Sequence, residues 1–150
     1  MVPALILLIF LLPYAASVMV NSWSNSSETI ALQDATTHIT SSIQQLYFFL
    51  DSPSLSSATV TNSVGIPTYI NGYAYSGKAT LTSTSGSSSE KVLNLTLTFI
   101  GNTISTSSIV TLGGNVQLTS SSITFTSTAP NTCISAYKDS SNTIWLSFTT

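Results

Sequence analysis

The residues that most often carry out chemistry in proteins are few and widely separated in this sequence. No two of its five acids have the spacing of a metal-ligand pair or of an acid/base pair; they are Glu28, Asp34, Asp51, Glu90 and Asp139. Serine is abundant, but His38 is the only imidazole that could activate a serine or the single Cys133. A Gly-rich phosphate loop and a G-x-S-x-G motif are both absent. The sequence therefore predicts no enzymatic activity, no cofactor and no metal site, and Cys133 is interpreted as a small buried apolar residue.

Charge is unusually sparse. Charged residues make up 5% of the 150 residues, the net charge is −2, arginine is absent, and the three lysines lie far apart. Without a basic cluster the chain has no electrostatic footprint for nucleic acid. Proteins with so little charge tend to associate, so either association is the purpose or glycan supplies the missing hydrophilic layer. A hydrophobic content of 43% argues against a disordered Ser/Thr linker.

Two sequons could accept N-linked glycan: Asn25-Ser26-Ser27 and Asn94-Leu95-Thr96. Asn94 alternates with Leu93, Leu95 and Leu97, so a strand here would point it away from the core. Asn25 follows an apolar segment, and packing between chains could hide it. Both are glycosylation candidates.

The first twenty residues are the most informative segment. Met1–Val20 reads MVPALILLIFLLPYAASVMV and carries no charge, and a helix of about 20 residues spans the roughly 30 Å hydrocarbon core of a bilayer. Ala15-Ala16-Ser17 could be a signal-peptide cleavage site, but a signal peptide needs a basic region before its apolar run. An ordinary single-pass anchor would likewise be flanked by lysine or arginine. Neither has its expected basic residues here.

The helical pattern continues past this run. Apolar residues recur every three or four positions on one face: Ala31, Ala35, Ile39, Ile43, Leu46, Tyr47 and Leu50. The opposite face is polar, with Gln33, Asp34, Thr37, Thr40, Ser41 and Gln44. Pro13 should kink the helix, and Asp51-Ser52-Pro53 should end it. We expect a helical unit over residues 1–52, apolar on all sides over 1–22 and amphipathic over 23–52.

These features resemble the type IV pilin family in its archaeal form. The resemblance rests on the bare apolar start at Met1, on Pro13 within it, and on the polar-faced continuation to Leu50. Bacterial pilins carry a glutamate near the start of the segment, whereas this chain has Leu5 and no acid before Glu28. The resemblance implies a leader peptidase, a membrane platform protein and an assembly ATPase as partners. It also implies that the helix leaves the cytoplasmic membrane to pack in a filament core through Leu5, Leu8, Ile9, Leu12, Pro13, Ala16 and Val20.

Residues 53–150 have the pattern of a β domain. Leu93, Leu95, Leu97 and Phe99 alternate with polar residues, as in a half-buried strand. Other short runs of this kind are separated by turn signals, among them Asn71-Gly72, Ser76-Gly77 and Gly113-Gly114-Asn115. Such spacing favours an antiparallel sandwich or barrel. The expected fold is therefore α+β: a long hydrophobic N-terminal helix followed by a Ser/Thr-rich β head.

The leading functional hypothesis is a structural subunit of an archaeal type IV pilus. The chain would polymerise with itself into an extracellular filament used for surface adhesion, after insertion in the cytoplasmic membrane. Two alternatives remain open: a membrane-anchored small surface adhesin, and a subunit of an archaellum, the archaeal flagellum-like filament.

Overall fold

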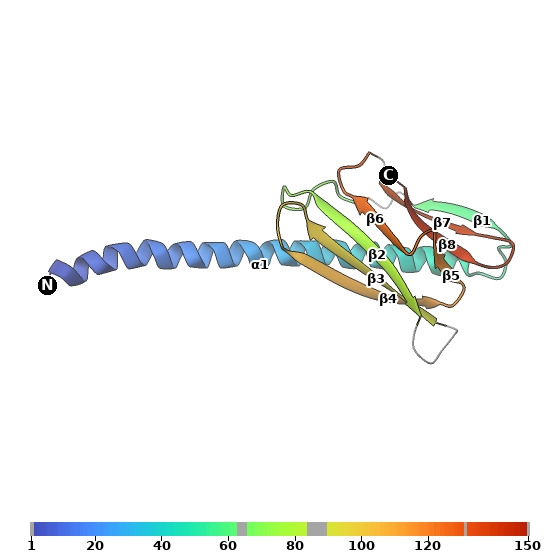
Figure 1. The fold of residues 1–150 in the computed structure, drawn as a ribbon, viewed down its shortest axis with the longest axis horizontal. Helices are drawn as coiled ribbons and strands as arrows, with labels where there is room; N and C mark the ends of the chain where they lie inside the picture. The colour runs from blue at the N-terminus through green and yellow to red at the C-terminus, as the bar shows by residue number, and fades with distance from the viewer. Residues whose placement is uncertain (1, 63–65, 84–89, 131, 150) are drawn as a thin grey trace.

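A computed structural model describes residues 2–62, 66–83, 90–130 and 132–149, with side chains from Leu12 onward except that of residue 62. Within these residues, one long helix precedes eight strands (Figure 1). Their bounds are α1 Val2–Leu50, β1 Ala58–Asn62, β2 Tyr75–Ser83, β3 Glu90–Phe99, β4 Ser105–Gly113, β5 Val116–Leu118, β6 Ser122–Thr126, β7 Cys133–Lys138 and β8 Ile144–Thr149. The expected α+β organisation, with one long N-terminal helix, is confirmed.

Helix α1 ends at Leu50, as the proline at position 53 predicts. Pro13 lies inside the helix, which continues on both sides of it. From Glu28 onward, residues spaced three or four apart are buried: Leu32, Thr36, Ile39, Ile43, Leu46 and Leu50. Such spacing places them on one face, and this face packs against β4 and β3 of one sheet and against β7 and β1 of the other.

The polar face of α1 was predicted incorrectly at one position. Thr40, expected to face solvent, is buried. Its hydroxyl donates to the Thr36 carbonyl at 2.7 Å, so burial leaves no unpaired hydroxyl. Thr36 is buried too and donates to the Leu32 carbonyl at 2.6 Å, which leaves the Thr106 hydroxyl of β4 to donate to Thr36 across 2.8 Å. Threonine can therefore serve as a core residue on this helix.

The strands form two four-stranded sheets with orders β1-β7-β8-β5 and β4-β3-β2-β6. Pairing is antiparallel except between β5 and β8, which run parallel from Val116↔Ile144 to Leu118↔Leu146. The expectation of a wholly antiparallel head is therefore wrong at this pair. The Gly113-Gly114-Asn115 turn does not return β5 to β4. It carries the chain into the other sheet, where the Ile144 N–H donates to the Asn115 carbonyl at 2.8 Å.

Ser76-Gly77 is not a turn, as its composition had suggested, but the start of β2. Gly77 lies opposite Phe125 of β6. A Cβ atom at Gly77 would come within 2.1 Å of the Phe125 ring. Glycine is therefore needed here for space beside an aromatic ring, which is a recognised role of glycine inside strands.

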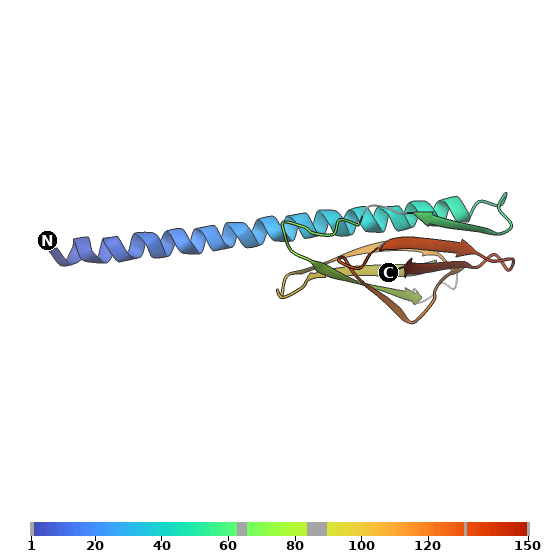
Figure 2. The same cartoon turned by 90° about the horizontal axis from the view of Figure 1, so that it is seen from above.

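One apolar core joins the helix and both sheets. It includes Ile39 and Leu46 from α1, Leu95 from β3, and Ile134 and Leu146 from the other sheet. Figure 2 shows the second half of α1 lying along the strands, whereas its first half extends beyond them. The head therefore covers only half of the helix.

Candidate functional site

The first half of α1 has no cover from its own chain. Every side chain from Leu12 to Ser27 is exposed, and the first buried one is Glu28. We call residues 2–27 the stem. Its exposed large apolar residues are Leu12, Tyr14, Val18, Met19, Val20 and Trp23. Val18, Met19 and Val20 are consecutive, so they point in three directions about the helix axis. No single partner surface on one side could cover all three.

The residues predicted to pack in a filament core belong to this stem. Leu12, Pro13, Ala16 and Val20 are exposed, whereas the side chains of Leu5, Leu8 and Ile9 lie outside the described residues. Within the residues that the structure describes, no helix is long and apolar enough to cross a lipid bilayer.

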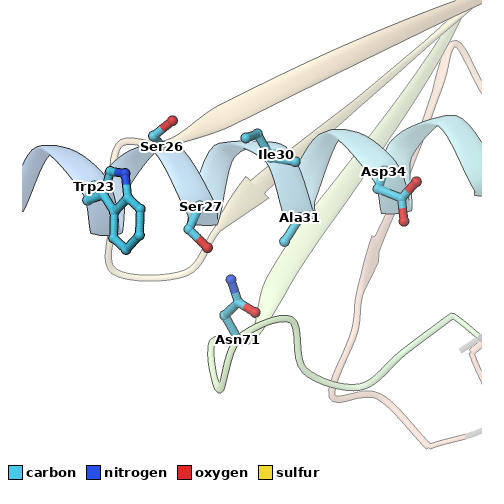
Figure 3. Close-up of a pocket in the computed structure, with 7 residues that line it drawn as sticks. All are labelled: Trp23, Ser26, Ser27, Ile30, Ala31, Asp34 and Asn71. Atoms are coloured by element: carbon cyan, nitrogen blue, oxygen red, sulfur yellow. The ribbon is translucent and has the colours of Figure 1, made fainter.

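A groove of about 560 Å³ marks the place where the stem meets the head (Figure 3). Trp23, Ser27, Ile30 and Ala31 line it from the helix, and Asn71 lines it from a turn of the head. Trp23 is 85% exposed and Ile30 is 64% exposed. A bulky apolar surface so accessible to water is suited to being covered by another molecule.

The Asn71 side of the groove depends on a tight turn. Ile70 and Tyr73 exchange two backbone hydrogen bonds, of 3.0 and 2.9 Å. Asn71 and Gly72 between them both have positive φ, 50° and 83°. The Asn-Gly pair is the sequence that favours such a turn. The sequence indicated the turn, but not that it would lie against the helix.

At the other end of the head, polar contacts hold the C-terminal end of α1. Asn115 accepts from the Tyr47 hydroxyl at 3.3 Å and donates to Asp51 at 2.9 Å. Burial raises the pKa of the Tyr47 hydroxyl, and the nearby Asp51 carboxylate raises it further. Lys138 is buried and donates to the Ser52 carbonyl at 3.1 Å. A cation at a helix C-terminus is favourable because carbonyl groups there are unpaired. These contacts fix the helix to the head.

The loop between β7 and β8 is organised around Asp139. This carboxylate accepts hydrogen bonds from the Ser141 hydroxyl, the Trp145 indole and the backbone N–H groups of Thr143 and Ser141. Together they lower the pKa of Asp139 to about 2. All these donors belong to the same hairpin, so the arrangement stabilises the turn.

The remaining reactive residues are dispersed. His38 is exposed on α1 and Cys133 is half-buried at the start of β7. In the described part of the chain, no three His, Cys, Asp or Glu side chains come close enough to hold a metal ion.

The two glycosylation candidates lie in different surroundings. Asn25 is exposed on the stem, within the helix. Asn94 is half-buried in β3, on the face of the strand opposite the buried Leu93, Leu95 and Leu97. The expected alternation therefore holds at Asn94.

In comparisons with known proteins, the chain matches no family model, no curated protein and no solved structure.

Proposed function

We propose that this chain is the structural subunit of an extracellular filament built in the manner of an archaeal type IV pilus. The stems of many copies pack together as the filament core, and the β heads form its outer wall. The observation that carries the proposal is a 49-residue helix of which only the second half is covered by its own head. The apolar residues of the other half are exposed on all sides of the helix, so several neighbouring helices are needed to cover them.

The magnitude of this exposure favours association. Fully burying one large apolar side chain contributes about 1.5–3 kcal/mol. Leu12, Tyr14, Val18, Met19, Val20 and Trp23 are each between 52% and 85% exposed. Covering these six supplies on the order of 10 kcal/mol, which is comparable with the estimated cost of lost translational and rotational freedom on association. The apolar residues from Met1 to Leu11 in the sequence add to this gain.

In this proposal the head is a sandwich of the two sheets, with α1 along one side. A single core containing residues of α1 and of both sheets supports this arrangement. Before assembly the stem rests in the cytoplasmic membrane, where lipid covers the apolar side chains that neighbouring stems cover in the filament. The assembly partners are those that the pilin resemblance implies.

The test is polymer formation by variants whose folding as single chains should be unaffected. Val18 is 52% exposed in the isolated chain, so Val18→Lys places its ammonium in water there. Inside a bundle of stems the same charge would be buried without a partner, at a cost of several kcal/mol. We expect Val18→Lys chains to be made but not to form filaments in pelleting assays and electron micrographs. Val18→Ile, which keeps the site apolar, should form filaments normally.

Ser140→Lys supplies the matched charge control, because Ser140 is exposed at the β7–β8 hairpin. It should polymerise like the unmodified chain. Normal filaments from Val18→Lys would refute packing through the stem. If the unmodified chain instead remained in the membrane fraction without filaments, the membrane-anchored adhesin would be favoured.

A further inference from the structure

The outer face of the β4-β3-β2-β6 sheet is a surface of hydroxyl groups. Its side chains alternate with the buried ones and come into register across the four strands. One row is formed by Ser105, Thr98, Ser76 and Thr126, and the next by Ser107, Thr96, Lys78 and Thr124. In these two rows Lys78 is the only charged residue, so hydroxyl groups supply most of the hydrogen bonds to water.

Asn94 lies inside this face and not at its edge. Its register neighbours are Thr80 on β2 and Ile109 on β4. Ile109 is 67% exposed, which makes it the largest apolar side chain open to solvent in this part of the sheet. An amide that carried a bulky hydrophilic group here would shield this isoleucine.

The orientation of the Asn94 amide suits such a group. Its Oδ1 atom is buried and has no hydrogen-bond partner, although the side chain as a whole is partly exposed. With Oδ1 buried, the exposure of this side chain belongs to its remaining atoms, Nδ2 among them. Thr96, the hydroxyl residue of the sequon, lies two positions along β3 and therefore on the same face.

We propose that Nδ2 of Asn94 carries an N-linked glycan that extends over the outer face of this sheet. In the transfer, Nδ2 forms a bond to the anomeric carbon of a lipid-linked sugar phosphate. The bond from that carbon to the phosphate oxygen breaks, the lipid phosphate leaves, and a base of the transferase takes the amide proton. The glycan adds hydration to a head with almost no charge and covers Ile109.

Asn25, by contrast, should carry no glycan. It lies within α1, where its carbonyl accepts a bond from the Thr29 hydroxyl at 2.8 Å. A glycan there would stand among packed stems. This exclusion rests on the stem packing in the proposed function, whereas the assignment of Asn94 rests only on the export of the head, which the proposed function also requires.

The experiment is intact-mass spectrometry of the full chain purified from the cells that produce it. We expect a mass above the 15.8 kDa of the unmodified chain. Asn94→Gln and Thr96→Val should both lose the same increment, beyond the change due to the substitution itself. Thr96→Ser keeps the sequon and should retain the increment, as should Asn25→Gln. Thr96→Val leaves Asn94 in place, so a shared loss cannot be attributed to misfolding of one variant.

An increment retained in both Asn94→Gln and Thr96→Val would overturn the assignment, and so would a native chain with the bare mass. Pelleting of the same samples separates this inference from the proposed function. Filaments of Asn94→Gln that have lost the increment would support both. A glycan on Asn94 in a chain that never polymerises would support the inference and refute the proposed function.

Discussion

A single methyl group at Gly77 should destabilise the head measurably. The Cβ atom of alanine would lie 2.1 Å from Cε1 and 2.3 Å from Cζ of Phe125, far inside van der Waals contact, so one of the two residues must move. The Phe125 ring is confined on two sides. It stacks on Phe148 with centroids 4.5 Å apart and meets Tyr75 edge-on at 6.4 Å.

The expected magnitude combines two opposing effects. Overpacking in a closed core costs typically 1–3 kcal/mol. Replacing glycine by alanine also restricts the unfolded chain, which offsets about 0.4–1 kcal/mol. The net loss for Gly77→Ala should therefore be about 1–2 kcal/mol, which lowers the Tm of a domain of this size by roughly 3–10 °C.

The assay is thermal unfolding of the full chain in mild detergent, followed by circular dichroism, with Gly77→Ala, Phe125→Leu and the double variant. Phe125→Leu removes the ring that meets the new methyl group. The double variant should therefore be more stable than the sum of the two single losses predicts, with a positive coupling in the range found for contacting residues, about 0.5–3 kcal/mol. An unchanged or raised Tm for Gly77→Ala would refute the steric argument, and so would strictly additive losses.

Three further predictions concern other contacts. Thr36→Val should lower stability by about 0.5–1.5 kcal/mol because Thr106 loses its partner, and Thr36→Val combined with Thr106→Val should recover much of that loss in the same unfolding assay. Asp139 has its pKa lowered to about 2 from its ordinary value of 3.8, so its bonds stabilise the fold above about pH 4 and are lost as pH falls toward 2. The Tm deficit of Asp139→Ala should accordingly be present at pH 7 and disappear near pH 2; a constant deficit would contradict this account. Filaments should pellet unchanged in molar salt but release subunits into detergent, because apolar stems hold them together; release by salt with resistance to detergent would contradict a hydrophobic core.

The helix could be predicted from the sequence because its signals are local. Continuous apolar residues, then a three-to-four spacing, then a proline define α1 and its end near Leu50. The error at Thr40 came from treating threonine as a solvent-facing residue. Burial of that hydroxyl depends on a bond to the helix backbone itself, which hydropathy does not register.

A strand could be predicted where apolar and polar residues alternate strongly. It could not be predicted where contacts with distant residues determine the structure. Leu93, Leu95 and Leu97 identify β3 unambiguously. The pairing of the short strand Ala58–Asn62 with β7 crosses most of the head sequence, so no local pattern indicates it. Ser76-Gly77 was misinterpreted because the need for glycine arises from Phe125, nearly fifty residues away. Local composition carries no information about that ring.

The candidate site also combines features that the sequence indicates with features that it does not. The stem follows from the apolar run alone, and so do the predicted packing residues Leu12 and Val20. The groove could not be predicted, because it requires the Asn71 turn to lie beside Ser27 and Ala31 of the helix. The burial of the Asn94 amide oxygen could not be predicted either, since it depends on the neighbouring strands.

Threonine and serine in place of charged residues suit a helix that is buried along part of its surface. From Leu12 onward, where the side chains of α1 are described, five hydroxyls donate to the carbonyl four residues earlier; they belong to Thr29, Thr36, Thr37, Thr40 and Ser42. A hydroxyl paired in this way is polar enough for water, yet its donor stays satisfied when a neighbour covers it. Covering a lysine or glutamate costs more, because a charge that leaves water must be paired or hydrogen-bonded by its new surroundings. A helix that packs on its own head along one face, and on other copies elsewhere, therefore gains from hydroxyl side chains that tolerate both surroundings. The head has few charged groups to bind water. A glycan there would therefore add more hydration than elsewhere in the chain.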